Sequence, residues 1–227
     1  MCFNKKSSII SYTLGSICSL ILFYIGDKYD KCIAIFSLCF IQIQLAEFFM
    51  WSDQSCGKIN HFASIFANIA LPLQPLSIFL VILFYKTTYI PQNIIYFCLV
   101  LVSIHLIKTI INNIKNKRQL CSKETKSGFL EWDFPYDKHS SLEKIIDLII
   151  YFIFVFIPWL FFKNHFKGNL VFFIGLTTLL YSHFTNKNNK INIFQQWESK
   201  WCILSVIIPI IFLFIKIPFV KKLISQI

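Results

Sequence analysis

Long, uninterrupted apolar runs dominate this sequence. A bilayer core about 30 Å thick needs roughly 20 apolar residues to be crossed by one helix. Each run is continuous rather than alternating, which excludes the strands of an outer-membrane barrel. The sequence predicts an all-α polytopic transmembrane helix bundle of about seven spans, forming one integral membrane domain over residues 1–227. The expected spans are 7–26, 32–51, 61–85, 94–112, 145–162, 169–184 and 201–219.

The composition agrees with this class. Hydrophobic residues make up 56% of the chain and charged residues only 15%, whereas a soluble domain has about 25% charged residues. A soluble enzyme, a disordered tail and a disulfide-rich secreted module are therefore poor fits. No small-residue cleavage site precedes Asp27, so the first run is expected to be a retained helix. The sixth run is short, which leaves six spans plus a re-entrant segment as the alternative.

Basic residues indicate an orientation in an unspecified membrane. Loops on the amino-terminal side carry thirteen Lys and Arg residues, against seven on the other side. Short cytoplasmic loops are enriched in these residues. The count favours a cytoplasmic amino terminus and a non-cytoplasmic carboxyl terminus.

The one sizeable loop, 113–144, would then be cytoplasmic. Its second half alternates acids with aromatic residues, which suit the headgroup layer; an ordinary solvated loop is the alternative. Its first half is basic and could attract anionic lipid of the bilayer by about 1 kcal/mol per residue. The net charge of +11 is thereby explained by topology, and no nucleic-acid-binding signature accompanies it. The basic residues are Lys115, Lys117, Arg118, Lys123 and Lys126.

The second expected span contains the most informative polar residues. Gln44, Glu47 and Trp51 are spaced i, i+3, i+7 and share one helix face. An ionisable residue inside a span is costly unless it is paired, protonated or hydrated, so it is a functional-site hypothesis by default. The alternatives for Glu47 are a hydrogen bond that only holds neighbouring helices together and a carboxylate that reaches the lipid headgroups.

The third span combines polar residues with helix-breaking prolines. Asn68 and Gln74 lie in it, together with Pro72 and Pro75. Prolines free backbone carbonyls, and such breaks often line cavities. A packing kink closed by Gln74 itself is the equal alternative.

Alternating helix direction places further polar residues at a similar depth. A shared pocket would bring Glu47 to an ion pair with Lys108 or Lys200, although lysines near helix ends also snorkel to the interface. The candidate polar site comprises Gln44, Glu47, Asn68, Gln74, His105, Lys108, His183 and Lys200.

Known catalytic and metal-binding patterns are missing from the sequence. There is no H-E-x-x-H pair and no G-x-S-x-G elbow, so no metal, cofactor or catalytic residue is assigned. The eight cysteines show no C-x-x-C spacing. Cys2, Cys56, Cys121 and Cys202 would face the reducing cytoplasm, which argues against disulfides.

Two short motifs resemble a family of uncharacterised multi-pass membrane proteins from bacteria, algae and large DNA viruses. Its members open with Met-Cys-Phe-Ser and carry Gln-Gln-x-x-Glu-Gly-x-x-Trp in the second helix. Gln44, Glu47 and Trp51 match that run, whereas Ile43 and Phe48 depart from it. The resemblance covers about the first 75 residues. It implies a shared fold and a role for the glutamine–glutamate face, but no activity.

Three functions remain open at this point. The leading hypothesis is a transporter- or channel-like bundle for a small solute or ion. The second is a membrane-embedded lipid-modifying enzyme with Glu47 as acid or base and a histidine partner. The third is a non-catalytic membrane component, cellular or viral, in which the polar groups hold helices together.

Overall fold

The computed structural model describes residues 4–125, 128, 130–133, 141–185 and 206–217. The regular structure of these described residues is helical, apart from one short antiparallel ladder, in which Lys123 faces Glu131 and Glu124 faces Leu130, and an isolated bridge between Thr88 and Phe162. The elements are α1 (Lys5–Ile25), α2 (Lys28–Ser52), α3 (Lys58–Tyr85), α4 (Gln92–Lys115), β1 (Lys123–Glu124), β2 (Leu130–Glu131), α5 (Ser141–Leu160) and α6 (His165–Thr185). A further helix covers Val206–Ile215.

Each of the seven expected apolar segments contains a helix, so the all-α prediction is confirmed. Four helices, α1 to α4, are long and apolar enough to cross a membrane. Two shorter apolar helical stretches, Ile149–Leu160 and Val206–Ile215, also belong to the described residues.

Acidic and polar caps explain where the first three helices begin. The Asn4 side chain accepts from the Ser7 backbone, and Asp27 accepts from the backbone of Asp30. Both starts are capping boxes, which satisfy the free N–H groups of a first turn. The start of α3 has no side-chain cap at Gly57 itself, and the Asp53 carboxylate accepts from the backbone N–H groups of Gly57 and Asn60 instead.

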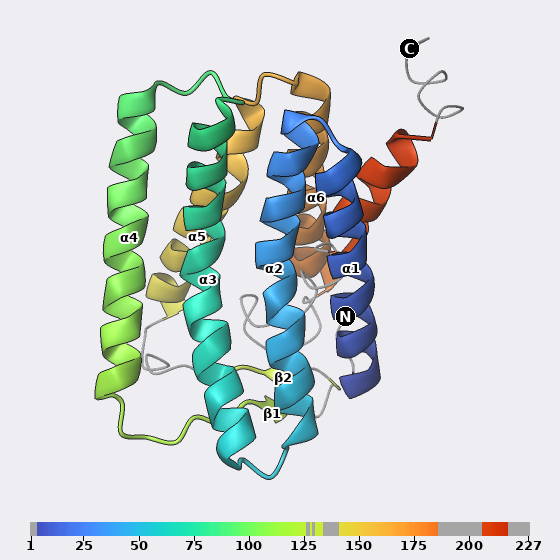
Figure 1. Ribbon diagram of the computed structural model, residues 1–227. Coiled ribbons are helices and arrows are strands. Elements are labelled where there is room, and N and C mark those ends of the chain that lie inside the picture. Colours follow the sequence, from blue (N-terminus) through green and yellow to red (C-terminus); the bar gives the residue numbers. More distant parts are fainter. Residues whose placement is uncertain (1–3, 126–127, 129, 134–140, 186–205, 218–227) are drawn as a thin grey trace.

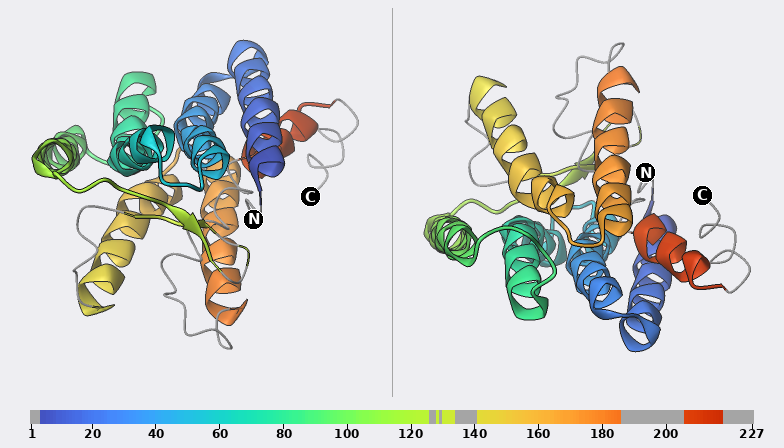
Figure 2. Two further views of the ribbon diagram at one scale, coloured as in Figure 1. Left: turned by 90° about the horizontal axis from the view of Figure 1, so that it is seen from below. Right: turned by 90° about the horizontal axis from the view of Figure 1, so that it is seen from above.

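The helices form a curved row with a second layer against it. Figure 2 shows α4, α3, α2 and α1 side by side, with α5 and α6 packed on one side of that row. In the most apolar 18 residues of each helix, 61% of the residues of α2 are buried, but only 17% of those of α4. The central position of α2 therefore makes any polar residue on it an interior group.

The outer surface of the row is apolar. On α4 most of the exposed side chains are apolar, as expected of a surface that faces lipid tails rather than water, and His105 and Lys108 are exposed among them. The apolar ones include Ile94, Phe97, Val100, Leu101, Ile104, Ile107 and Ile111.

An aromatic cluster joins the two layers. The Trp159 ring of α5 lies 5.0 Å, centroid to centroid, from the ring of Phe36 on α2 and 5.0 Å from that of Phe162. All three side chains are buried. Edge-to-face aromatic pairs add about 0.5–1.5 kcal/mol to the burial of their apolar surface.

The bundle has two different ends (Figure 1). At one end, here called the turn end, α2, α4 and α6 begin. Backbone hydrogen bonds there join the α3–α4 turn to the α5–α6 turn. Tyr89 N donates to Phe161 O at 2.9 Å, and Lys163 N donates to Thr87 O at 2.8 Å. The described part of residues 116–133 is here called the cap. It lies at the opposite end of the bundle, the cap end, together with the start of α1 and the α2–α3 turn.

Gly168 tests the packing at the turn end. A Cβ atom at this position would overlap the backbone carbonyl oxygen of Trp159, whereas one at Gly15 would meet only the flexible tip of Ile41 at 2.6 Å. We expect Gly168→Ala to destabilise the folded protein by about 1–3 kcal/mol. Gly15→Ala, the matched control, should cost clearly less. Thermal midpoints in detergent measure both, and equal midpoints for the two variants would contradict this packing.

Candidate functional site

A line of buried polar residues runs along α2. Asp30, Ser37 and Gln44 are spaced seven residues apart, and each is fully buried. Seven residues are almost two helical turns, so the three lie on one side of the helix. Glu47, also fully buried, lies one turn beyond Gln44. The eighteen residues from Asp30 to Glu47 cover about 25 Å at a rise of about 1.5 Å per residue, most of a bilayer core.

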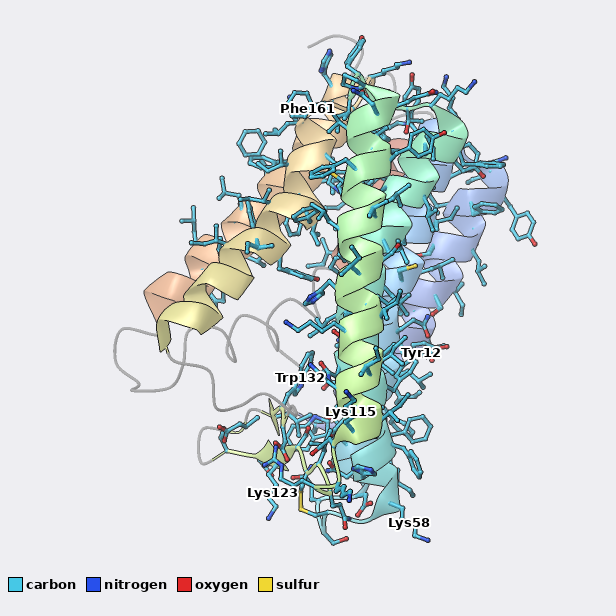
Figure 3. All side chains as sticks on the ribbon, turned by 90° about the vertical axis from the view of Figure 1, so that its left-hand side faces the viewer. Tyr12, Lys58, Lys115, Lys123, Trp132 and Phe161 are labelled. Carbon is cyan, nitrogen blue, oxygen red and sulfur yellow. A yellow bond between two sulfur atoms is a disulfide. The ribbon has the colours of Figure 1, made fainter. Side chains whose placement is uncertain are left out.

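The Glu47 carboxylate lies beneath the cap. Trp132 Nε1 donates to Glu47 Oε1 at 3.2 Å, and Gln44 Nε2 lies 3.4 Å from Glu47 Oε2. The interpretation of Glu47 as a carboxylate that reaches the headgroups is therefore wrong. So is the placement of Trp132 in the headgroup layer, because this side chain is only 3% exposed and packs between α2 and α3. Figure 3 shows Trp132 at the inner side of the cap end.

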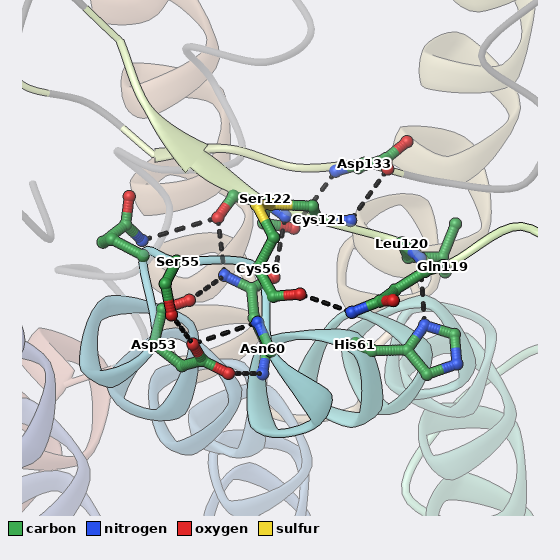
Figure 4. Close-up of a disulfide and its surroundings, with 12 residues drawn as sticks. Asp53, Ser55, Cys56, Asn60, His61, Gln119, Leu120, Cys121, Ser122 and Asp133 are labelled. Carbon is green, nitrogen blue, oxygen red and sulfur yellow. Dashed lines mark hydrogen bonds between the residues drawn. A yellow bond between two sulfur atoms is a disulfide. The ribbon is translucent and has the colours of Figure 1, made fainter.

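Asn60 fastens the cap to the start of α3 (Figure 4). Its side chain donates to the carbonyl of Ser122 and accepts from the Ser122 N–H, both at 2.8 Å. The same amide also donates to the carbonyl of Asp53 at 2.9 Å. Ser64, one turn along α3, shares a hydrogen bond of 2.8 Å with the Ser122 hydroxyl. The Asn60 amide thus satisfies both the N–H and the C=O of Ser122, which a neighbouring β-strand would otherwise have to do.

A disulfide joins Cys56 to Cys121, with the Cα atoms 5.1 Å apart. The prediction that these two cysteines would be reduced is therefore wrong. The sequence argument placed them by loop orientation alone and had no information on their distance. Because Cys121 precedes Ser122, the same residues that bind Ser122 bring the two sulfur atoms together.

Further polar contacts hold the chain on both sides of this bond. Leu120 N donates to His61 Nδ1 at 2.9 Å, and Cys121 N donates to Asp133 Oδ2 at 2.8 Å. Arg118 forms an ion pair of 2.5 Å with the other oxygen of Asp133. The cap is thus a packed part of the molecule rather than an ordinary solvated loop.

Asn68 and Gln74 form side-chain hydrogen bonds to α4 and α5. Asn68 Nδ2 donates to Asn113 Oδ1 of α4 at 3.2 Å. The Tyr151 hydroxyl of α5 donates to Gln74 Oε1, and Gln74 Nε2 has no hydrogen-bond partner within the described part of the chain. The Gln74 amide therefore does not close the kink made by Pro72 and Pro75, contrary to one expectation.

The remaining candidates are not gathered around Glu47 by the described structure. His105 and Lys108 lie on the exposed side of α4, and Lys108 forms no ion pair with a described residue. Lys200 and Lys126 lie outside the described residues, and so does the side chain of His183. Among the described residues, no group of three His, Cys, Asp or Glu side chains has the arrangement of a metal site.

A second buried carboxylate lies at the turn end. Asp30 forms ion pairs of 2.5 Å with Lys167 of α6 and 2.5 Å with Lys216, which follows the last helix. Lys167 also contacts Asp27 at 2.9 Å. Partial burial raises the pKa of Asp27, but hydrogen bonds from Lys167 and the Asp30 backbone outweigh it and hold the pKa below its ordinary value. Two carboxylates and two ammonium groups thus join three helices.

Sequence analysis identifies Gln44 and Glu47 but misses Asp30 and its partners at the turn end, and Asn60 and Ser122 at the cap end. The expected spans leave Asp30 in the loop between residues 26 and 32 and place Lys216 inside the span 201–219. The seven-residue spacing of Asp30, Ser37 and Gln44 was a usable signal, as was the four-residue spacing of Asn60, Ser64 and Asn68. No comparable signal joined either set to Lys167 or to Ser122.

Replacing Asn60 tests the fastening of the cap. Asn60→Ala leaves the buried N–H and C=O of Ser122 without their partner, and each such group costs about 1–3 kcal/mol. We expect a clear loss in the free energy of unfolding and faster protease cleavage of the cap. Asn93→Ala, at the exposed start of α4, is the control. Equal stability of the two variants would show that Asn60 does not hold the cap.

Asp53 makes the stability of the cap end depend on pH. Hydrogen bonds from the Asn60 backbone, the Ser55 hydroxyl and the Gly57 backbone hold the pKa of Asp53 below its ordinary value of 3.8. Such a carboxylate stabilises the folded state above pH 3.8, and the contribution is lost as the pH falls through the lower folded pKa. The thermal midpoint of wild type minus that of Asp53→Asn should therefore be constant from neutral pH and shrink below pH 3.8. A difference that persists in stronger acid would contradict this assignment.

Comparison of the chain with models of protein families, with curated proteins and with solved structures found no match. The functional argument therefore depends on the geometry of the bundle itself.

Proposed function

We propose that the chain is a multi-pass integral membrane protein of about seven spans that carries a small cation, in the simplest case the proton, along α2. The observation that supports this is the buried line from Asp30 through Ser37 and Gln44 to Glu47. Polar and ionisable residues inside a membrane are expensive and mark ion pathways and proton relays. The Glu47 carboxylate at one end of the line favours a cation over an anion, whereas Asp30 at the other end is paired with Lys167 and Lys216.

Unsatisfied hydroxyl groups in the middle of the line support the same proposal. Gly15 on α1 closely approaches Ile41 on α2. Four residues further along α1 is Ser19, and four residues back along the antiparallel α2 is Ser37, so both lie at one depth. Their Oγ atoms are buried and have no hydrogen-bond partner among the described residues. A hydroxyl that binds water or a passing ion accounts for such an atom, which is otherwise costly.

The lipid bilayer is the partner proposed for the rim of the cap. Lys115, Lys117 and Lys123 are exposed beside the apolar surface of α4. Ammonium groups in this position contact lipid phosphates of either leaflet, so this part of the proposal does not depend on the orientation of the bundle.

The non-catalytic membrane component is the second candidate. The hydrogen bond from Trp132 to Glu47 favours it, because the same carboxylate holds the cap in place. Under that alternative the α2 line stabilises the bundle and nothing moves along it.

Proton flux into proteoliposomes distinguishes the two. The purified chain is reconstituted with a pH-sensitive dye inside, and a potassium gradient with valinomycin drives protons inward. We expect the wild type to acidify the lumen well above empty vesicles and Glu47→Gln to lose most of that flux. The glutamine oxygen can still accept from Trp132, so this hydrogen bond to the cap is kept.

Glu124→Gln is the matched control, because it makes the same chemical change on an exposed carboxylate of the cap. It should conduct like the wild type. Wild-type flux no greater than that of empty vesicles, with folded and inserted protein, would reject the proposal in favour of the membrane component.

A further inference from the structure

We infer that the cap end of the bundle lies in an oxidising compartment, so that the amino terminus is non-cytoplasmic and Cys56–Cys121 is formed there by a thiol oxidoreductase. This orientation is opposite to the one indicated by the basic residues. It is independent of the proposed cation transport, which concerns α2 in either orientation.

Non-covalent contacts place the two cysteines for oxidation. Asn60 holds the backbone of Ser122, and the Gln119 side chain donates to the carbonyl of Cys56. The Cα separation of 5.1 Å lies within the range that disulfides require, about 4.4–6.8 Å. The bond therefore closes a geometry that the surrounding hydrogen bonds already favour.

The backbone of Cys56 supports the same conclusion. Its φ is 65°, in the left-handed region where glycine or asparagine is usual. Cysteine has no conformational advantage at such a position. Its side-chain chemistry, the bond to Cys121, accounts for a cysteine there.

The placement of the other cysteines separates two classes. The described cysteines with free thiols, Cys18, Cys32, Cys39 and Cys98, all lie within α1, α2 or α4. Those outside helices in the described part of the chain are Cys56 and Cys121, and they are bonded to each other. Disulfides persist in oxidising compartments and are rare in the cytosol.

The count of thirteen basic residues against seven is weaker evidence against this orientation than the totals suggest. Around α1, α2 and α3 the two ends are equal. Lys5, Lys6 and Lys58 lie at the cap end, against Lys28, Lys31 and Lys86 at the turn end. The excess comes entirely from Lys115 and the residues that follow it. The backbone of the cap, which carries several of them as exposed side chains, is held against the bundle by Asn60, His61 and the disulfide.

The oxidation balances as a disulfide exchange. The Cys56 and Cys121 thiols together lose two protons and two electrons as their S–S bond forms. The acceptor is the disulfide of a thiol oxidoreductase in that compartment, which is reduced to a dithiol.

Two readouts on the full chain, expressed in endoplasmic-reticulum microsomes, test the inference. The first is electrophoretic mobility with and without reductant. We expect a reductant-dependent shift that Cys56→Ala and Cys121→Ala each abolish and that Cys98→Ala, the matched control, retains. The second is a short amino-terminal extension with a glycosylation acceptor, which should be glycosylated because it is lumenal.

Each outcome decides the inference. A shift together with a glycosylated amino terminus supports it. No shift in the wild type, or a shift that Cys98→Ala also loses, overturns the assigned bond. A shift with an unglycosylated, protease-accessible amino terminus overturns the orientation and shows that a cytoplasmic oxidant makes the bond. None of these results changes the expected flux of Glu47→Gln in vesicles.

Discussion

The paired hydrogen bonds between Asn60 and the backbone of Ser122 are the interaction on which the cap end depends. Backbone N–H and C=O groups that are buried need hydrogen-bond partners within the protein. Asn60 supplies both partners at once. With Ser122 in place, Cys121 meets Cys56 and Trp132 reaches Glu47. One amide therefore organises the covalent bond and the cover of the buried carboxylate.

The two ends of α2 are stabilised by different physics. At the cap end a disulfide spans a sequence separation of 65 residues, which in the chain-entropy model destabilises the unfolded state by about 4 kcal/mol. At the turn end Asp30 is paired with two lysines. Removing one partner of such a buried pair typically costs about 3–5 kcal/mol, although the intact pair itself adds little net stability. The cap end is thus held against unfolding, and the turn end is held in one particular arrangement.

The sequence was sufficient for the helices and for one face of α2, because both depend on local spacing. Apolar runs of membrane length predicted α1 to α4, and the i, i+3 spacing of Gln44 and Glu47 predicted their shared face. The cap, the disulfide and the pairing of Asp30 with Lys167 were not predictable in this way. These contacts join residues 62, 65 and 137 positions apart, and no periodicity in a single sequence reports which loop returns to which helix.

The backbone bridge between the α3–α4 and α5–α6 turns has a mechanical consequence. The backbone hydrogen bonds of Tyr89 and Lys163 fix the start of α4 to the end of α5. Figure 3 shows that α5 and α6 lean away from the row toward the cap end. The bridge is therefore a fixed point about which α5 can rotate. A rotation of about 10° around it would move the far end of the 20-residue α5 by about 5 Å, since such a helix is about 30 Å long. Small adjustments at the turns are therefore amplified into large displacements at the start of α5.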